Sequence, residues 1–311
     1  MRTLVIGAGA LGGYFGACMA RAGRDVTFLV RENRARQLAK NGLRVLSPHG
    51  DFSVPAVTVR AGEIRDTFDL ILVGAKAYSL PEAMEQFAPA VGKTTAILPV
   101  LNGMAHLDSL ATRFGAEHVL GGKALISAAL DGEGRIVLFA PFHELSFGEL
   151  QGGLSDRTHA LAALFDGCGF DAPAKPNILQ DMWDKFAQLA AGAGMTCLMR
   201  GSSGDIQNAP GGREAFLTLY AECRSVAAAA GFASTPSYVE FMIKTMIAPG
   251  SPLKASMLRD IERGGPTEGD HVFGDLLARA QALGVVTPIL NLARIHVATY
   301  EIVRAKEAAA K

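Results

Sequence analysis

The sequence predicts an α/β fold with two domains, a doubly wound sheet followed by an all-helical domain. The chain of 311 residues is roughly twice the usual size of a single domain. In its first half, short β-rich runs alternate with helical patterns, which is typical of βαβ units and a mostly parallel sheet. From about Asn177 onward, apolar residues recur at three- and four-residue spacing in Ala- and Leu-rich segments, which indicates amphipathic helices. We therefore place the domains at residues 1–178 and 179–311.

Charge and composition exclude several classes of function. Thirty basic residues balance thirty acidic ones, so no overall field favours nucleic acid or a membrane surface. No apolar run reaches about 18 residues, and the sequence after Met1 lacks the features of a signal peptide, so we expect a cytoplasmic protein. The cysteines lie far apart and the histidines lack metal-ligand spacing, so we expect no metal site.

Seven β-rich runs define the first half. They are Thr3–Ile6, Asp25–Val30, Leu70–Val73, Thr95–Pro99, Val119–Gly121, Arg135–Ala140 and Glu144–Gly148. Their alternation with helical patterns predicts a mostly parallel sheet that antiparallel strands close. The last two runs look like a hairpin.

Glycine- and proline-containing breaks divide the second half into helices. The breaks are Gly201–Gly204, Ala209–Gly212, Gly231–Pro236, Ala248–Pro252 and Gly264–Pro266. Between them, pairs such as Met242 and Met246 recur at helical spacing. We therefore expect several helices joined by short loops.

A glycine-rich turn follows the first strand and opens a helix. Its residues are Gly7, Ala8, Gly9, Ala10, Leu11 and Gly12. The first glycine permits a tight turn, the second lets the backbone approach a pyrophosphate, and the third lets helix and strand pack closely. A purely structural glycine turn is the alternative. The strand before the turn, the helix after it and the second strand favour dinucleotide binding and a Rossmann-type domain.

The end of the second strand predicts which dinucleotide is bound. An acidic residue there would bind the ribose 2′-hydroxyl of NAD and repel the 2′-phosphate of NADP. Here Arg31 follows the strand and Arg34 is a second candidate, so NADP is favoured, although Glu32 lies between them. The alternative is that these arginines belong to an ordinary solvated surface.

Lys76 and Asn102 lie just beyond the third and fourth β-rich runs. Ligands of open α/β sheets bind outside the carboxyl ends of the strands, so polar residues at these two positions are expected to face a ligand. A loop lysine and an Asn-Gly turn are the alternatives.

Over nearly its whole length, the chain resembles the ketopantoate reductase (2-dehydropantoate 2-reductase) family. The matching pieces are Gly7-Ala8-Gly9-Ala10-Leu11-Gly12, Arg31, Lys76, Asn102-Gly103-Met104, Ala128, Trp183-Asp184-Lys185, Ser256-Met257-Leu258-Arg259-Asp260 and Pro266-Thr267-Glu268. The glycine turn is shared by many dehydrogenases. The Trp-x-Lys helix and the Ser-Met-Leu block with its following glutamate are more specific.

The resemblance implies an NADPH-dependent enzyme that reduces the C2 ketone of a 2-keto acid, as in pantothenate biosynthesis. It implies that Lys185 is the proton donor and that Ser256 binds the polar groups of the substrate. Glu268 would contact the cofactor and help to position Lys185. Independently of the family, a cation beside the carbonyl oxygen would stabilise the negative charge that hydride addition builds there.

The same resemblance places three further residues at the site. Asn102, Lys76 and Ala128 would line the nicotinamide and ribose side of the cofactor, and Asn102 would also contact the substrate. The implied partner is a small-molecule carbonyl compound. The Ala-rich helical half allows a homodimer as well as a monomer, so the sequence leaves the oligomeric state open.

The chain departs from the family at four positions where asparagines are common. They hold Leu189, Ala193, Ser203 and Leu253. An apolar pocket senses mainly size, whereas hydrogen bonds select strongly, so ketopantoate itself becomes doubtful as the substrate. We expect a paralogue that reduces a more apolar ketone or an imine. Gln188 and Thr196 are candidates to replace some of the polar contacts.

Two other functions stay open. The first is a non-catalytic NADP(H)-binding sensor, against which the retention of Lys185, Ser256 and Glu268 argues. The second is a reaction like that of opine or hydroxyacid dehydrogenases on the same scaffold. His271, three residues after Glu268, could face the same cleft, but a packing role is favoured for it.

Overall fold

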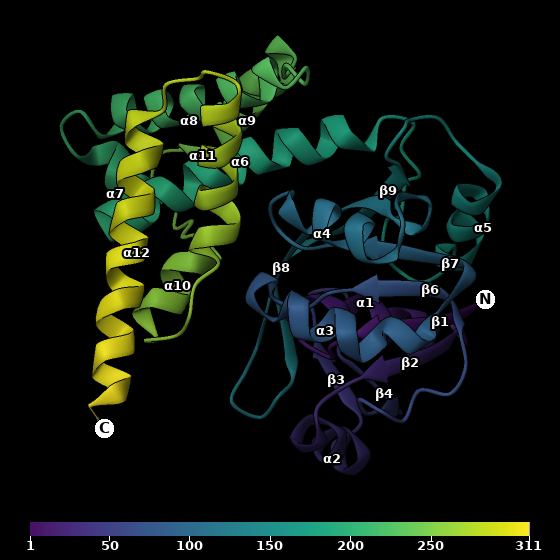
Figure 1. Ribbon diagram of the computed structural model, residues 1–311. Helices are drawn as coiled ribbons and strands as arrows, with labels where there is room; N and C mark the ends of the chain where they lie inside the picture. Colours follow the sequence, from purple (N-terminus) through teal and green to yellow (C-terminus); the bar gives the residue numbers. More distant parts are fainter. Residues whose placement is uncertain (311) are drawn as a thin grey trace. The chain divides into compact units, whose positions relative to one another are not determined.

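The computed structural model describes residues 1–310 and divides the chain into two compact units (Figure 1). The first unit consists of Met1–Leu101 and His106–Leu179. The second consists of Asn102–Ala105 and the chain from Gln180 onward. The predicted α/β class, with a parallel sheet near the N-terminus and a helical second half, is confirmed.

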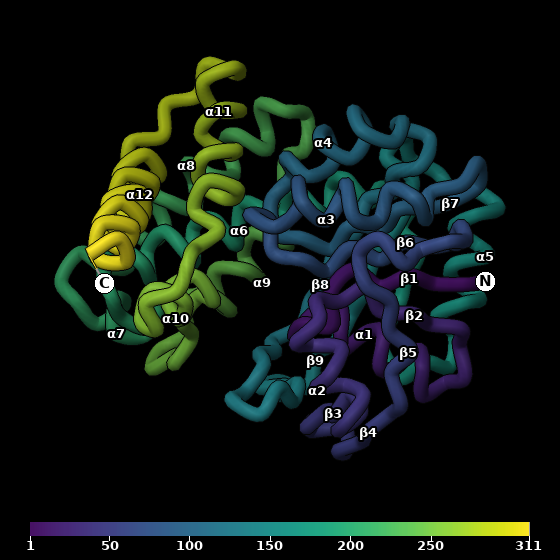
Figure 2. The backbone as a smooth tube through the Cα atoms, turned by 60° about the horizontal axis from the view of Figure 1, so that its bottom comes forward, coloured from purple at the N-terminus to yellow at the C-terminus, as the bar shows by residue number. Residues whose placement is uncertain are grey.

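A parallel five-stranded sheet forms the first layer of the N-terminal unit. Its strands are β1 (Arg2–Ile6), β2 (Asp25–Leu29), β5 (Val57–Val59), β6 (Phe68–Val73) and β7 (Val91–Pro99), in the order β5-β2-β1-β6-β7, which can be followed in Figure 2. Ile6 is opposite both Leu29 and Val73, and Val73 is opposite Pro99. Because these strands end level with one another, the residues that follow them lie along one edge of the sheet.

A second sheet contains β3 (Leu43–Leu46), β4 (Phe52–Val54), β8 (Leu120–Leu130) and β9 (Ile136–Glu149), in the order β4-β3-β9-β8. The predicted hairpin is wrong, since both of its expected strands belong to β9, which pairs antiparallel with β8. Pro141, between the two expected strands, lies where the register shifts between Ile126 and Ala128. Such an irregularity tolerates a residue without an N–H. The antiparallel pairing thus lies in a second sheet, which an isolated bridge between Ile97 and Val119 joins to the first.

Helix α1 (Ala10–Arg21) contacts strands of both sheets, and its residues from Gly12 to Met19 are buried. Phe15 is fully buried and packs edge-on against Phe170 at 4.9 Å between ring centroids. The other helical segments of this part of the chain are α2 (Glu32–Asn41), η1 (Ala77–Ser79), α3 (Leu80–Phe87), η2 (Ala88–Ala90), α4 (Ala105–Phe114), η3 (Ala116–His118) and α5 (Asp156–Phe165). The burial of α1 fixes the start of this helix, and therefore the glycine turn, relative to β1.

Helices make up the second unit, as predicted. They are α6 (Ile178–Met199), α7 (Ser203–Asn208), α8 (Gly212–Ala229), α9 (Pro236–Met246), α10 (Ser256–Glu262), the π-helical turn η4 (Asp270–Gly274), α11 (Asp275–Ala282) and α12 (Pro288–Ala309). The buried carboxylate of Glu222 accepts the backbone N–H groups of Ile289 and Leu290 at 3.1 and 2.9 Å. A carboxylate at a helix N-terminus satisfies otherwise unpaired donors, so Glu222 ties α8 to α12. Among the residues described, no helix is both long enough and apolar enough to cross a bilayer.

Candidate functional site

The glycine turn has the backbone geometry that its sequence predicts. Gly7 has φ +85°, a left-handed conformation that favours glycine, and its N–H donates to the Leu29 carbonyl at 3.0 Å. A Cβ on Gly12 would lie 2.8 Å from the Gly7 carbonyl oxygen, and a Cβ on Gly74 would lie 2.7 Å from the Gly12 Cα. The start of α1 therefore packs against the ends of β1 and β6 with no room for a side chain.

The N-terminus of α1 is suited to bind an anion. Gly9 is its N-cap residue, and no side chain among the described residues caps the helix. A Cβ on Gly9 would meet no atom within 4 Å, so the space beside this residue is open. Uncapped first-turn amides and the positive end of the helix dipole favour phosphate. These features fit the pyrophosphate of a dinucleotide.

Arg31, at the N-cap position of α2, carries an exposed guanidinium. Its Nη2 lies 2.8 Å from Oε2 of Glu82, and both side chains are more than half exposed. The neighbouring acid, Glu32, pairs with Arg60 and lies 3.7 Å from Nε of Arg36. Exposed ion pairs are weak, so a 2′-phosphate could compete with Glu82 for Arg31. Two arginines also offset the charge of Glu32, the residue that weakened the sequence argument for NADP.

Arg34 is engaged differently from Arg31. Its Nε and Nη2 donate to the Ala8 carbonyl at 3.1 and 2.9 Å, and its Nη1 donates to the Gly134 carbonyl at 2.9 Å and to Gln37. The side chain is half-buried, and burial lowers the pKa of its guanidinium. Four of the five N–H donors of an arginine are thus used inside the protein. The second 2′-phosphate ligand proposed from the sequence is turned toward the glycine turn instead.

The other two cofactor candidates of this unit lie on separate elements. Lys76 is exposed in the turn after β6. Because β6 is next to β1, Lys76 lies beyond the same edge of the sheet as Gly7. Ala128 is half-buried on β8, opposite Leu138 and beside the register shift. Like Arg31, Lys76 is accordingly a cation at the sheet edge where ligands of such folds bind.

Asn102 belongs to the second unit, where its turn contacts the segment that follows Glu268. Gly103 has φ +81°, and a Cβ there would lie 2.7 Å from the backbone oxygen of His271. His271 also hydrogen bonds to the backbone of Asn102, and the Met104 N–H donates to Oδ2 of Asp275 at 3.3 Å. Sequence reasoning favoured packing for His271 and did not identify Asp275. The spacing of His271 from Glu268 was the signal available.

Glu268 and His271 flank the start of the π-helical turn. Glu268 is only 8% exposed, and its carbonyl accepts the Val272 N–H at 2.9 Å. Burial lowers the pKa of His271, against the opposing effects of Glu268, Asp275 and the Asn102 backbone. Turns of this type are frequent at functional sites. This one places the buried carboxylate of Glu268 in the same segment as the residue that holds Asn102.

Lys185 is half-buried on α6, two residues after the fully packed Trp183. The indole stacks on Phe232 with 5.9 Å between centroids, and the guanidinium of Arg279 lies 5.6 Å from its ring centre. Nε of Arg279 in turn donates to Oδ1 of Asp275 at 2.8 Å. Asp275 therefore connects the turn of Asn102 to the part of α6 that carries Lys185. Ser256, the first residue of α10, is also half-buried.

The four positions that depart from the family differ in exposure. Ala193 and Ser203 are buried, whereas Leu253 is 42% exposed and its carbonyl accepts the Ser203 N–H at 2.9 Å. The Ser203 hydroxyl has no accessible surface, so the hydrogen-bonding capacity expected of it is not available at the surface. Thr196 is also fully buried and donates to the Gly192 carbonyl at 2.7 Å. The expectation that Thr196 replaces a polar ligand contact is therefore wrong.

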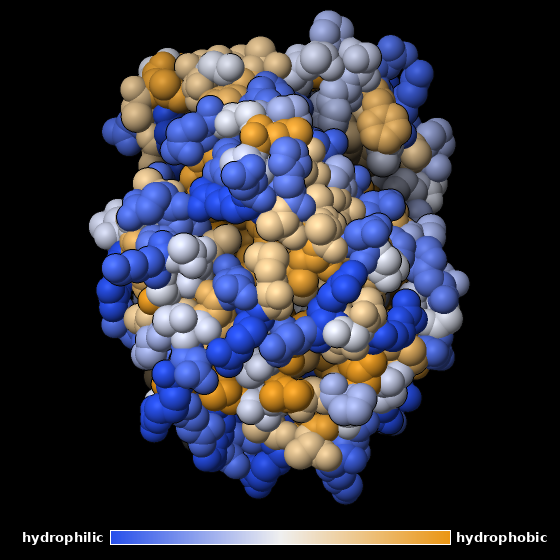
Figure 3. All heavy atoms as spheres, turned by 90° about the vertical axis from the view of Figure 1, so that its right-hand side faces the viewer, coloured by the Kyte–Doolittle hydropathy of each residue, from blue (hydrophilic) through white to orange (hydrophobic). Residues whose placement is uncertain are grey.

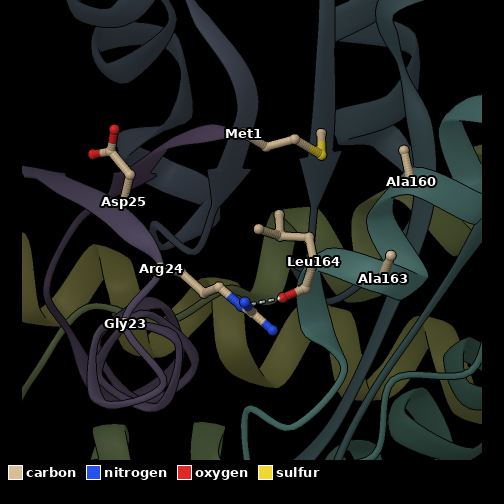
Figure 4. A pocket seen from close by; sticks show the side chains of 7 residues that line it. All are labelled: Met1, Gly23, Arg24, Asp25, Ala160, Ala163 and Leu164. Carbon is tan, nitrogen blue, oxygen red and sulfur yellow. Dashed lines mark hydrogen bonds between the residues drawn. The ribbon is translucent and has the colours of Figure 1, made fainter.

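An open pocket of about 510 Å³ lies at the opposite edge of the parallel sheet, where β1 and β2 begin (Figure 4). Its walls include Met1, Asp25 and Leu164, and Nε of Arg24 donates to the Leu164 carbonyl at 2.9 Å. Ligands of such sheets bind at the carboxyl edge, so this pocket is not the dinucleotide site. On the face drawn in Figure 3, hydrophilic residues are interspersed with apolar patches. No group of three or more potential ligands among the described residues could hold a metal ion.

Comparison with known proteins identifies matches in both halves of the chain. Residues 3–152 match the family model described as ketopantoate reductase PanE/ApbA, and residues 177–305 match the model of its C-terminal part. The Bacillus subtilis (strain 168) protein named uncharacterized oxidoreductase YkpB is 38% identical to this chain over 301 residues. The match covers 97% of this chain and 99% of that protein. The 2-dehydropantoate 2-reductase of Mesorhizobium japonicum is 27% identical over 94% of this chain and 95% of its own. The crystal structure of 2-dehydropantoate 2-reductase from Geobacter metallireducens superposes with a TM-score of 0.88, at 31% identity, over 96% of this chain and 99% of that one.

Proposed function

The chain belongs to the ketopantoate reductase family of nicotinamide-dependent oxidoreductases, and we propose that it is an NADPH-dependent reductase of a 2-keto acid. The observation that carries this proposal is the glycine turn, in which an uncapped helix N-terminus adjoins open space at Gly9. The exposed Arg31, with Glu32 offset by two arginines, supports NADP over NAD. The relatives named 2-dehydropantoate 2-reductase support the reaction class.

In this proposal the glycine turn, Arg31, Lys76, Asn102 and Ala128 hold the cofactor. The first-turn amides of α1 bind the pyrophosphate, and Arg31 binds the 2′-phosphate. Lys76, Asn102 and Ala128 line the ribose and nicotinamide side. When bound, NADPH supplies the hydride that the ketone carbon C2 accepts.

Lys185 completes the reaction at the carbonyl oxygen. As C2 gains the hydride, the electron pair of the C=O double bond moves to the oxygen, which takes a proton from the Nζ ammonium of Lys185. A 2-hydroxy acid results, and the amine of Lys185 then regains a proton from water. Ser256 binds polar groups of the substrate and Glu268 positions the ammonium. The cation acts mainly in the transition state, because the oxygen is most negative there.

The replaced asparagines favour a substrate more apolar than ketopantoate. Leu189, Ala193 and Leu253 offer no side-chain hydrogen bonds, and the Ser203 hydroxyl is buried. A pocket lacking these donors and acceptors selects its ligand mainly by size and apolar contact. We therefore propose an aliphatic or aromatic 2-keto acid as the second candidate.

Steady-state rates of NADPH oxidation test both proposals. We expect turnover with at least one of ketopantoate, 2-ketoisovalerate, 2-ketoisocaproate and phenylpyruvate, and a higher kcat/KM with NADPH than with NADH. A strong preference for ketopantoate would contradict the proposal of an apolar substrate but not the proposed reductase activity. Tight binding of NADPH without turnover of any 2-keto acid would contradict the reductase and favour a sensor.

A further inference from the structure

We propose that Arg34 is a positioning residue that orients the phosphate-binding turn, and not a ligand of the 2′-phosphate. The inference rests on the proposed binding of NADP(H) to that turn. Two nitrogens of its guanidinium donate to the same oxygen, the carbonyl of Ala8, at 3.1 and 2.9 Å. Ala8 lies between the left-handed Gly7 and the N-cap residue Gly9. Arg34 therefore binds the backbone carbonyl at the middle of the turn.

The planarity of the peptide bond explains what this contact does. In a trans peptide the C=O and the following N–H point in opposite directions. Every peptide bond in the described chain is trans. By holding the Ala8 carbonyl, Arg34 makes the Gly9 N–H point in the opposite direction within the same peptide plane. A Cβ on Gly9 would meet nothing within 4 Å, so this residue borders open space. Fixing the Ala8 carbonyl thus presets an amide donor for the pyrophosphate before any nucleotide binds.

A second set of contacts holds Arg34 itself in place. Its Nη1 donates to the Gly134 carbonyl at 2.9 Å, and Gln37, one helical turn along α2, donates to the Glu133 carbonyl at 2.8 Å. Both carbonyls belong to the turn between β8 and β9, where Oδ1 of Asp131 accepts two backbone N–H groups at 2.9 Å. The guanidinium is thus fixed between two turns that are more than a hundred residues apart in the sequence.

Charge adds to the geometry. Burial lowers the pKa of Arg34, but an arginine stays protonated in proteins. Its positive charge is half-buried, so solvent screens it less than it screens the exposed charge of Arg31. The charge therefore reinforces the attraction of the α1 N-terminus for a pyrophosphate, which NADPH and NADH share.

The roles of Arg31 and Arg34 can be distinguished by comparing NADPH with NADH, because these nucleotides differ only in the 2′-phosphate. We expect R34Q to weaken the binding of NADPH and NADH by the same factor, about tenfold or more for the loss of charge-assisted hydrogen bonds. R31Q, the matched control, should weaken NADPH binding by a similar factor and leave NADH binding within about twofold. Dissociation constants come from titrations of the full-length protein that monitor nucleotide fluorescence.

Two further measurements distinguish positioning from general destabilisation. R34K keeps the charge but lacks the fork, so it should show a smaller loss that is again equal for both nucleotides. In both variants kcat at saturating NADPH should stay within about twofold of the wild-type value, while the KM for NADPH rises in proportion to the Kd. Amide hydrogen exchange of the nucleotide-free protein should become faster in R34Q at residues 8–12 and 132–135.

The possible results separate this inference from the proposed function. A loss of NADPH binding without a loss of NADH binding in R34Q would make Arg34 a phosphate ligand and overturn the inference. Unchanged affinities, or unchanged exchange at residues 8–12, would also overturn it. If the wild-type protein bound neither nucleotide, the proposed function would fail, whereas hydrogen exchange would still test whether Arg34 holds the turn.

Discussion

Lys185 carries the proton-transfer step of the proposed reaction, and its substitution should separate catalysis from binding. In K185M the carbonyl oxygen loses both its cation and its proton donor, so we expect kcat to fall by about 10²- to 10⁴-fold. The Kd for NADPH should stay within about twofold, because the lysine is proposed to act on the substrate oxygen. Lys244, an exposed lysine paired with Glu240 on α9, gives the control K244M. A K185M variant with normal kcat would remove Lys185 from the mechanism.

Asp275 accepts a hydrogen bond from a backbone N–H and also forms an ion pair, so its charge should stabilise the second unit. It accepts from Met104 and pairs with Arg279, and its side chain is only 10% exposed. We expect D275N to lower the free energy of unfolding by about 1–3 kcal/mol, since a charge-assisted acceptor is lost. Urea unfolding monitored by the fluorescence of Trp183 reports this directly, because Arg279 lies over that indole.

Asp270 supplies the matched control for this measurement. It pairs with Arg294 but is 85% exposed, so D270N should change the free energy of unfolding by less than about 0.5 kcal/mol. Equal effects of D275N and D270N would contradict the proposed role of Asp275.

The sequence identifies residue types better than it identifies their contacts. Arg31 and Arg34 have the same side chain three positions apart, yet one is exposed at the surface and the other is directed to the Ala8 carbonyl. The contacts that hold Arg34 come from Ala8 and from the β8–β9 turn, about a hundred residues later, which a local sequence pattern does not contain. For the same reason the sequence only favoured a packing role for His271 and left a position in the cleft open. Its hydrogen bond to the Asn102 backbone joins two distant parts of the chain.

The glycine turn allows a comparison of two substitutions within one element. Gly9 has φ −84° and open space around it, so G9A should fold normally, but its methyl group should obstruct the pyrophosphate. In Gly12 the added methyl would instead meet the Gly7 carbonyl at 2.8 Å, so G12A should also destabilise the first unit, by about 1–3 kcal/mol. Thermal unfolding and NADPH titration of both variants check these expectations. A G9A variant with wild-type affinity would place the pyrophosphate elsewhere.

Strand length and strand pairing account for what the sequence did and did not predict of the sheets. The main runs were found because β1, β2, β6 and β7 are buried and β-rich. The strands β3, β4 and β5 have only three or four residues, too few to give a pattern. Strand β9 was expected as two strands, Arg135–Ala140 and Glu144–Gly148, whereas the structure has one strand that pairs with β8 on both sides of Pro141.

Both units contain a histidine that should make the protein less stable in acid. Burial lowers the pKa of His143 and of His271 from the ordinary value of 6.5, with a further lowering of the first by His49. The unfolded chain therefore takes up protons at a higher pH than the folded protein does. The contribution of these two histidines to the free energy of unfolding is fully present above about pH 6.5. It is lost progressively as the pH falls toward and through their pKa values in the folded protein.

Urea midpoints between pH 8 and pH 5 measure this effect. We expect the midpoint to fall below pH 6.5, and to fall less in the double variant H143Q/H271Q. The variant H159Q, which changes an exposed histidine, should keep the wild-type profile. A midpoint that stays constant down to pH 5.5 would contradict the assignment.

The segment Asn102–Ala105 groups with the helical unit although chain of the first unit precedes and follows it. A single cut near residue 178 would therefore leave these four residues on the fragment that lacks His271 and Asp275, their partners in the turn. Neither half of the sequence could therefore be replaced, as one continuous segment, by the corresponding half of a relative without separating these contacts. Recombination between family members would have to transfer the short segment and the helices together, or a hybrid would inherit a mismatched turn at Asn102.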